Sequence, residues 1–270
     1  MNKICERQEK IKIVSESDTH IGSSSGLLPS IAESFDGNIY TKVKQNAMQR
    51  WMWKNRLDDL STIGKADVYL FLGDSVEGKQ IRMGGRTLQS ADIDDQIEWA
   101  KRSIQVALDL IKPKYFIGIS GTNYHIRSGG NADLTVYKML GKDNPNIKFF
   151  CEDIITMQIG DLIWGLAHPY PNVQYSAPPL EKLISQHAIE YYLGSMPKIS
   201  VFARGHAHRF TWLQYRGGIY AYVNPCWQPT SAYGRSRPYL SVRTPDVGLL
   251  ELTQIKKTLT PMPHLHIWRV

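Results

Sequence analysis

Long hydrophobic runs are missing from this sequence. No segment of its 270 residues approaches the roughly 18 consecutive apolar residues of a membrane-spanning helix, and the first residues, MNKICERQEKIKIV, hold no apolar stretch of secretory-signal length. The composition, 42% hydrophobic and 21% charged, is that of an ordinary soluble globular protein with ample material for a core. We therefore expect a cytoplasmic protein without a membrane partner.

Cysteine is also scarce. Cys5, Cys151 and Cys226 lie far apart, are odd in number and show no metal-ligand spacing, which argues against a disulfide framework. We expect all three to be packing residues. Internal repeats, low-complexity tracts and linker-like changes of composition are absent as well. The sequence therefore predicts a single domain over residues 1–270.

Acidic residues are outnumbered. There are 25 Asp and Glu against 32 Lys and Arg, a net charge of +7, which is compatible with an anionic partner such as nucleic acid or a phosphorylated small molecule. Two modest clusters, at 42–56 and 233–243, carry part of the excess. Each has the alternative of being a solvated face, so the charge indicates the sign of a substrate and no more.

Apolar and amphipathic runs alternate along the first half of the chain, which predicts mixed strands and helices. Buried strands are predicted at 10–14, 66–73, 114–120 and 147–151, and helices at 41–63, 92–112 and near 133–141. Acidic residues open the second of these helices, and Pro113 ends it. This half indicates repeated strand-helix-strand units.

Hairpins dominate the second half. The run 154–168 predicts two strands joined at Gly160-Asp161, and the run 211–224 predicts another pair that turns at Gly217-Gly218. A helix is predicted at 179–193, and further strands at 198–205, 247–255 and 264–270. We expect two sheets with helices on their outer faces.

Aspartate, histidine and asparagine residues gather directly after the predicted strands. Five strand ends carry them, in the motifs SDTH (Asp18, His20), LGDSVEG (Asp74), GTNYH (Asn123, His125), GLAHPY (His168) and RGHAH (His206, His208). Ligand sites in sheets covered by helices form at the carboxyl ends of strands, so these loops are expected to meet at one rim. Carboxylates mixed with imidazoles suit manganese, iron or zinc better than calcium or magnesium alone.

Each motif taken singly has an ordinary structural explanation. An Asp-x-His after a strand is more often a turn or a helix cap, Gly-Asp is a common turn pair, and His168 before a proline can be a half-buried histidine. All five motifs in this order, each after an apolar strand, favour a two-metal hydrolytic centre instead. In such a centre Asp74 can bridge two cations that acidify a shared water and neutralise a phosphoryl group.

In order and spacing, SDTH, GDSVE, GTNYH, AH and GHAH resemble the motifs of the calcineurin-like metallophosphoesterases. The resemblance covers residues 10 to about 225, with the closing strands also fitting, and is greatest to the compact members found in phages and prokaryotes. It implies an α/β fold, a four-layer α-β-β-α sandwich of two mixed sheets flanked by helices.

The resemblance also implies a ligand set for two divalent metal ions, expected to be manganese, with iron or zinc as alternatives. Asp18, His20 and His208 would hold the first metal, and His168 and His206 the second, while Asp74 would bridge. A bridging hydroxide would attack phosphorus in line with the leaving oxygen.

The GTNYH loop departs from the family pattern. The family usually shows Gly-Asn-His followed by an acid, whereas here Thr122 and Tyr124 interrupt the run. Either Asn123 binds the second metal and His125 is the catalytic acid that acts on the leaving group or phosphate, or a shifted loop makes His125 a ligand. We favour the first.

A second departure comes after Asp74. Protein Ser/Thr phosphatases of the superfamily carry Arg-Gly soon after that aspartate, but here the chain runs SVEGKQIR, which argues against a phosphoprotein phosphatase. Glu77 is expected to support a ligand rather than bind metal directly. Trp227 could stack on a base of the substrate, with packing in the core as the alternative.

These residues predict a metal-dependent phosphohydrolase, foremost a phosphodiesterase acting on a nucleotide or nucleic-acid bond. A phosphomonoesterase acting on a small phosphorylated substrate is an alternative. A non-catalytic metal-binding scaffold for a partner protein is another, although such scaffolds tend to lose ligands and here each expected position has a competent side chain. The sequence gives no oligomeric state.

Overall fold

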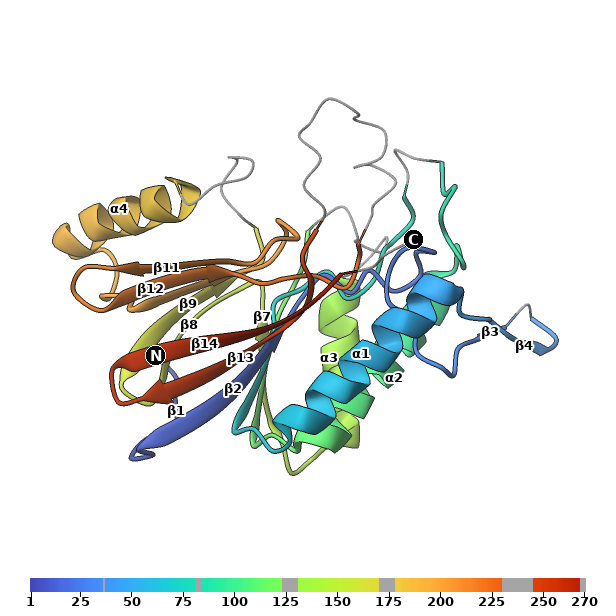
Figure 1. Cartoon of the computed structure of the whole chain (residues 1–270), viewed down its shortest axis with the longest axis horizontal. Coiled ribbons are helices and arrows are strands. Elements are labelled where there is room, and N and C mark those ends of the chain that lie inside the picture. Colours follow the sequence, from blue (N-terminus) through green and yellow to red (C-terminus); the bar gives the residue numbers. More distant parts are fainter. Residues whose placement is uncertain (36, 81–83, 123–130, 170–177, 230–244, 268–270) are drawn as a thin grey trace.

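Two six-stranded sheets packed face to face form the centre of the molecule, and helices cover both outer faces (Figure 1). The computed structural model describes residues 1–270 except 36, 81–83, 123–130, 170–177, 230–244 and 268–270. Two mixed sheets flanked by helices give the four-layer α-β-β-α sandwich, so the predicted fold class is confirmed. Among the described residues, no helix is both long and apolar enough to cross a membrane.

The first sheet has the strand order β14-β13-β2-β5-β6-β7. Its parallel strands are β2 (Lys10–Glu16), β5 (Val68–Phe71), β6 (Tyr115–Ile119) and β7 (Lys148–Glu152). The strands β13 (Val247–Ile255) and β14 (Thr258–His266) form an antiparallel hairpin at the edge beside β2. Residues of β5 are buried throughout, as the apolar run VYLF predicts for a strand covered on both faces.

The second sheet has the order β1-β8-β9-β10-β12-β11. Its strands are β1 (Lys3–Ile4), β8 (Ile154–Ile159), β9 (Leu162–Ala167), β10 (Val201–Arg204), β11 (Thr211–Tyr215) and β12 (Ile219–Val223). The predicted hairpins are both present, as β8 with β9 and β11 with β12. Since β9, β10 and β12 are parallel, their carboxyl ends lie at one edge of this sheet.

In the described residues, four helices complete the layers. Three of them, α1 (Ala47–Ile63), α2 (Ile93–Ile111) and α3 (Ala132–Asp143), lie on the outer face of the first sheet, and α4 (Pro178–Tyr192) lies beside β12 of the second (Figure 1). Fully buried apolar side chains fill the space between the sheets, among them Ile13, Leu70, Ile117, Trp164 and Tyr222. This packing fixes both sets of strand ends relative to each other.

Two predicted elements needed correction. The helix predicted from residue 41 begins at Ala47, because Asn46 and Gln49 form a capping box there. The closing strand predicted at 264–270 is β14, Thr258–His266, which includes Pro261 and Pro263. Both prolines are tolerated because β14 is an edge strand.

The residues before α1 form an arm that the sequence did not predict. Strands β3 (Glu33–Phe35) and β4 (Tyr40–Lys42) pair only with each other and project from the body beyond the ends of α1 and α2 (Figure 1). The base of the arm is tied to α2, where the indole Nε1 of Trp99 donates to the Glu33 carbonyl at 2.8 Å.

Candidate metal centre

The ends of β2 and β5 meet through backbone hydrogen bonds just before the candidate ligands. The amide of Asp18 donates to the Gly73 carbonyl at 2.9 Å, and the amide of His20 donates to the Asp74 carbonyl at 3.1 Å. From the opposite sheet, the amide of His206 donates to the Asp18 carboxylate at 3.0 Å. Three of the predicted motifs, SDTH, GDSVE and GHAH, therefore lie together at one edge of the sandwich.

In the described part of the chain, His, Cys, Asp and Glu side chains form two groups able to hold a metal ion. Within each group, one ligand atom from every residue lies within 4.8 Å of the others; the groups are Asp18, His20 and His208, and Asp74, His168 and His206. These are the six Asp and His residues that the sequence marked as ligands, divided between two positions.

The first group is tightly packed. Nε2 of His208 lies 3.2 Å from Oδ1 of Asp18, and Nε2 of His20 lies 3.8 Å from the same oxygen. The two Nε2 atoms face each other at 3.0 Å. Two imidazole nitrogens and a carboxylate oxygen thus lie close to one another, two of them from the SDTH segment and one from the GHAH segment. That arrangement suits a shared cation better than a hydrogen-bond network, because neutral imidazoles have only one ring N–H each.

The second group touches the first. Nε2 of His168 lies 3.0 Å from Oδ2 of Asp74 and 3.9 Å from Oδ1 of Asp18. Nε2 of His20 in turn lies 3.9 Å from Oδ2 of Asp74. Each group therefore presents a carboxylate toward a histidine of the other. The two groups are therefore adjacent and in contact through their carboxylates, as ligands shared between two metals would be.

The backbone is strained at most of these residues. Positive φ angles occur at Asp18 (54°), His20 (44°), Asp74 (53°), His206 (71°) and His208 (55°). Each non-glycine residue held there costs about 1–3 kcal/mol, and such residues concentrate at functional sites. The strain turns five ligand side chains toward one edge. Cations bound at the two positions would offer a physical reason for the strain to be retained.

Two of the candidate ligand histidines have a partner on Nδ1, the ring nitrogen that faces away from the centre. Nδ1 of His20 lies 3.0 Å from Oε2 of Glu77, and Nδ1 of His168 is hydrogen-bonded to the Leu72 carbonyl. Partners on the far nitrogen fix the tautomer so that Nε2 is left to face a metal. Glu77 itself accepts from the side-chain amides of Gln80 at 2.6 Å and Gln228 at 3.1 Å. Glu77 thus contacts a candidate ligand in the manner expected of a supporting acid.

The electrostatics of the two groups favour a cation. Burial opposes ionisation of Asp18, but the neighbouring charges of His168 and His208 outweigh it and hold the pKa of this carboxyl well below its usual range. Burial would lower the pKa of His168, yet the charges of Asp74 and Asp18 raise it to about 9. In the absence of a metal ion, the two carboxylates thus favour the protonated, positively charged form of His168. The carboxylates thus create a site of negative potential.

Asp133, in the first turn of α3, is a supporting residue that the sequence analysis missed. Its carboxylate accepts the amides of Ser75 at 2.9 Å, Gly121 at 2.7 Å and Asp74 at 3.2 Å, and so ties the loops after β5 and β6 together. Burial, and then the charge of Asp74, raise its pKa. The segment Asn131-Ala-Asp133 resembles an ordinary helix N-terminus, so no sequence signal separated this role from capping.

The GTNYH motif lies only partly within the described residues. Gly121 and Thr122 are described: the Thr122 amide donates to Oδ1 of Asp74 at 2.7 Å, and a Cβ at Gly121 would meet that oxygen at 1.9 Å. The glycine is required because the chain passes against the carboxylate. Asn123 and His125 lie outside the described residues, so which of them binds metal stays a prediction.

The interpretation of Trp227 as a stacking surface is wrong. Its side chain is fully buried, and its indole Nε1 donates to Oε1 of Glu16 at 2.9 Å. Glu16 also forms a buried ion pair with Arg56, whose Nε lies 2.9 Å from Oε1. The backbone amide of Trp227 donates to the Asp18 carbonyl at 3.0 Å. Trp227 therefore packs beneath the site and holds the Asp18 loop.

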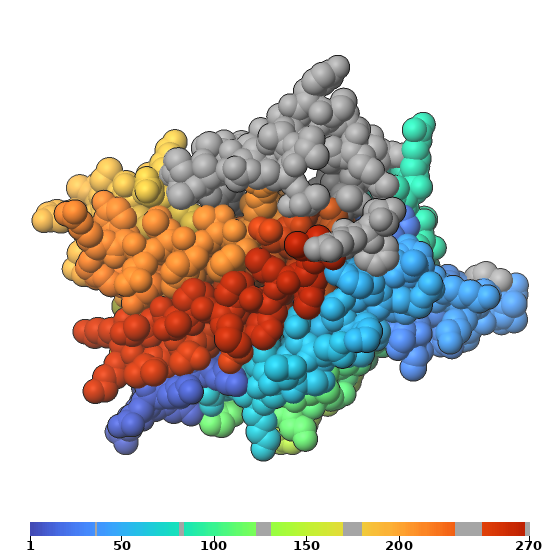
Figure 2. All heavy atoms as spheres, in the orientation of Figure 1, coloured from blue at the N-terminus to red at the C-terminus, as the bar shows by residue number. Residues whose placement is uncertain are grey.

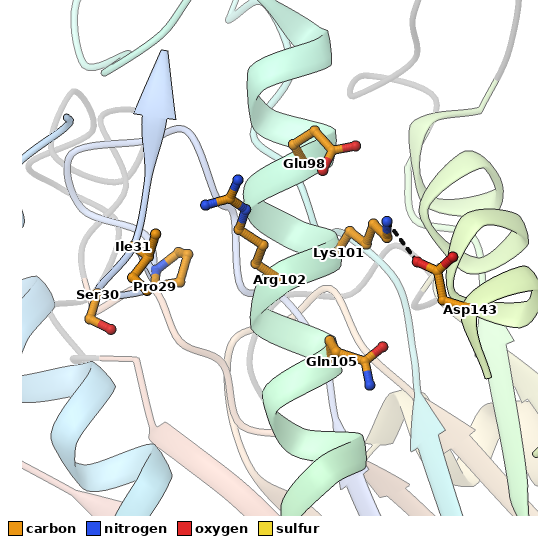
Figure 3. Close-up of a pocket in the computed structure, with 8 residues that line it drawn as sticks. All are labelled: Pro29, Ser30, Ile31, Glu98, Lys101, Arg102, Gln105 and Asp143. Atoms are coloured by element: carbon orange, nitrogen blue, oxygen red, sulfur yellow. Dashed lines mark ion pairs between the residues drawn. The ribbon is translucent and has the colours of Figure 1, made fainter. Parts of the chain in front are cut away.

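A surface hollow lies on the outer face of α2, apart from the candidate metal centre (Figure 3). It is lined by residues 29–31 and by the side of α2 from Glu98 to Gln105, with Lys101 paired to Asp143 at 2.7 Å across one end. None of the residues that form the two candidate metal groups lines this hollow. The hollow is therefore separate from the candidate ligands at the strand ends.

The candidate ligands thus lie at the strand ends of a two-sheet sandwich. The two-sheet sandwich and the clustered strand-end ligands are those that the resemblance of the motifs to the calcineurin-like metallophosphoesterases implies. No family model matches the sequence, and no curated protein matches it either. Solved structures that it is similar to include zinc-complexed Vps29 from Entamoeba histolytica, at 12% identity over 94% of this chain and 99% of that one, with a TM-score of 0.43.

Two further similar structures are named as phosphoesterases. One is a predicted phosphoesterase from Streptococcus pneumoniae, at 9% identity over 95% of this chain and 99% of that one, with a TM-score of 0.39. The other is a metallophosphoesterase from Sphaerobacter thermophilus, at 11% identity over 96% of this chain and 89% of that one, with a TM-score of 0.41. Because so few residues are identical, the similarity concerns the fold alone.

Proposed function

We propose that the protein is a dinuclear-metal-dependent phosphohydrolase, and that it acts as a phosphodiesterase on nucleotide or nucleic-acid substrates. The observation that carries this proposal is the contact between the two candidate groups. Asp18 and Asp74 each lie within 3.9 Å of a histidine of the other group, so that the six ligands form one continuous centre. The donor set of carboxylates and imidazoles favours manganese, with iron and zinc as alternatives.

The chain's own residues divide the work. Asp18, His20 and His208 would hold one cation, and His168 and His206 the other, with Asp74 shared between them. When bound, two divalent cations supply charge to neutralise the phosphoryl oxygens and acidify the water that attacks phosphorus. Glu77 and the Leu72 carbonyl keep Nε2 of their histidines directed at the centre. His125 is proposed to protonate the leaving oxygen or contact the phosphate.

The test compares substrates with the manganese-reconstituted protein. Bis(p-nitrophenyl) phosphate, p-nitrophenyl phosphate, single-stranded DNA and double-stranded DNA are offered in parallel, with D74N as the inactive reference. Cleavage of the diester and of DNA by the wild type, lost in D74N, is expected. Cleavage of the monoester alone would support the phosphomonoesterase alternative. No cleavage of any substrate by protein carrying its full metal content would overturn the proposal in favour of a scaffold.

The role of His125 has its own experiment. If this residue acts as the acid, H125A slows turnover strongly while the protein keeps two metal ions. If it is a ligand, H125A loses metal in parallel with activity. N123A gives the matched comparison, because it is expected to lower metal content before it affects the chemistry. The reverse pattern in the two variants would exchange their assigned roles.

A further inference from the structure

Two stretches of the chain carry basic residues without any acidic ones. Residues 37–57 and 78–91 contain no Asp or Glu. Apart from Lys54, their exposed cations among the described residues are Lys42, Lys44, Arg50, Lys79 and Arg86, which we call the basic shoulder. Among the described residues, no carboxylate lies within ion-pairing distance of any of these five, whereas Lys54 further along α1 is paired with Asp58 at 2.5 Å. The positive charge of the basic shoulder is therefore available to an anionic partner.

The basic shoulder is attached directly to the candidate metal centre. The loop 21–26 comes directly after the ligand His20, and both basic stretches bind to it. The Ser24 amide donates to the Thr87 carbonyl at 2.7 Å, and the side-chain amide of Asn46 donates to the Ser24 carbonyl at 2.7 Å. Nε2 of Gln49 adds a bond to the Ser23 carbonyl at 3.1 Å. The shoulder thus borders the catalytic edge.

The β3–β4 arm extends the same surface with aromatic rings. Phe35 and Tyr40 face each other across the two strands, with ring centroids 4.8 Å apart. Tyr40 is 72% exposed, and neighbouring Ile39 is 61% exposed. In the space-filling view the arm stands clear of the body as a projecting light-blue lobe (Figure 2). Phe35 and Tyr40 thus leave much of their apolar surface uncovered, and Tyr40 lies just before Lys42 and Lys44.

We propose that the arm and the basic shoulder together bind single-stranded nucleic acid and lead it to the metal centre. Cations complement phosphates at any sequence, and exposed aromatic rings stack on unpaired bases. A second copy of this chain fits less well, because a two-fold symmetric contact through this surface would set five cations against five. The inference rests on the proposed function, and it deepens that function by naming the substrate class and the surface that receives it.

The experiment measures binding of a fluorescein-labelled oligothymidylate of about 20 nucleotides to the metal-free full chain by anisotropy. In K42A/K44A/R50A, affinity is expected to fall about tenfold, and the slope of log affinity against log salt to shrink by roughly 2, since single strands give about 0.7 per phosphate contact. The matched control is K198A/R216A/K257A, which removes three exposed cations from the opposite ends of the strands. It should bind as the wild type does.

The arm is tested by Y40A, for which a loss of roughly fivefold or more is expected from one stacked base. Y192A is its control, because Tyr192 at the end of α4 is 91% exposed and outside the proposed surface. Equal binding by the triple variant and its control would overturn the inference. So would a Y40A protein that changes its mass in solution while it binds normally, since the arm would then serve self-association.

Hydrolysis of bis(p-nitrophenyl) phosphate separates this inference from the proposed function. The small diester needs only the metal centre, so K42A/K44A/R50A should hydrolyse it at the wild-type rate while losing oligonucleotide binding. If the wild type binds the oligonucleotide through the shoulder but hydrolyses no diester, the proposed function fails and the surface stands. If diester hydrolysis is intact and the shoulder variants bind normally, the inference alone fails.

Discussion

Nδ1 of His20 lies 3.0 Å from Oε2 of Glu77, and Nε2 of the same ring faces Nε2 of His208 at 3.0 Å. One imidazole thus joins a buried carboxylate to the first candidate metal position. A carboxylate behind a metal-binding histidine fixes the ring and makes it a stronger donor. We therefore expect much of the affinity of the first position to depend on this contact.

Replacing this carboxylate should weaken the first metal. We expect E77Q to lower the affinity for Mn²⁺ about 10- to 100-fold, because the amide no longer offers a charged acceptor to Nδ1. Isothermal titration measures the effect, and E6Q, which changes an exposed glutamate, is the control. Unchanged titrations of both variants would show that Glu77 supports the fold and not the metal.

Closing the space beside Asp74 should disrupt the centre. A Cβ at Gly121 would lie 1.9 Å from Oδ1 of Asp74, so G121A must displace the bridging carboxylate or the loop after β6. We expect diester hydrolysis to fall at least about 100-fold, in line with misplacement of a catalytic group by roughly 1 Å. In G141A, the new Cβ meets Phe149 at an ordinary 3.5 Å, so this helix variant should keep its activity. A fully active G121A protein would contradict the described approach of the loop to Asp74.

Asp133 should matter for stability as well as for the site. D133N replaces a carboxylate that accepts three backbone amides by a group with one accepting oxygen, and its NH₂ faces the remaining donors. We expect a loss of about 1–3 kcal/mol in the free energy of unfolding. Denaturant titration measures it, with D109N on the exposed face of α2 as control. Equal stability of the two variants would contradict this role.

A cluster on β14 predicts how stability depends on pH. The hydrogen bond to Asp59 raises the pKa of His264, while bonds from His264 and His266 overcome burial and lower the pKa of Asp59. His264 therefore adds stability below its ordinary pKa that is lost as pH rises through the raised value. Asp59 adds stability above its ordinary pKa that is lost as pH falls through the lowered value. The cluster therefore stabilises the fold most at a pH above the ordinary pKa of Asp59 and below that of His264, near pH 5 to 6.

D59N removes this charged acceptor between α1 and β14. We expect the variant to melt about 2–4 °C lower than the wild type near pH 5.5 and to approach it as the pH rises through the raised pKa of His264. Scanning calorimetry of the metal-free protein across this pH range measures the difference. The same offset at every pH would mean that Asp59 acts through packing alone.

Much of the fold was predictable because the strands repeat a strong pattern. Apolar runs such as VYLF in β5 end at polar motifs, and parallel strands bring those ends to one edge whatever the details of packing. The predicted division of the ligands between two metal positions also agrees with the two groups in the structure, but it did not come from the strand pattern. It came from the family resemblance, because hydrophobic periodicity alone does not assign a ligand to one metal or the other.

The features that were missed depended on tertiary context. The β3–β4 arm has only three residues per strand and no apolar face to bury, so periodicity gives it no signal. Pro261 and Pro263 concealed β14, since they are compatible with a strand only at a sheet edge. For Trp227 the sequence left stacking on a base and packing in the core open, because its burial against Glu16 is not evident from the sequence order.

The metal content of the reconstituted chain tests the central claim most directly. After reconstitution with Mn²⁺ and removal of the excess, elemental analysis should find two ions in each wild-type chain. It should find about one in H206A, which keeps Asp18, His20 and His208 intact. A wild-type chain that holds one ion or none, or an H206A chain that holds as many as the wild type, would contradict a two-metal centre built from these strand ends.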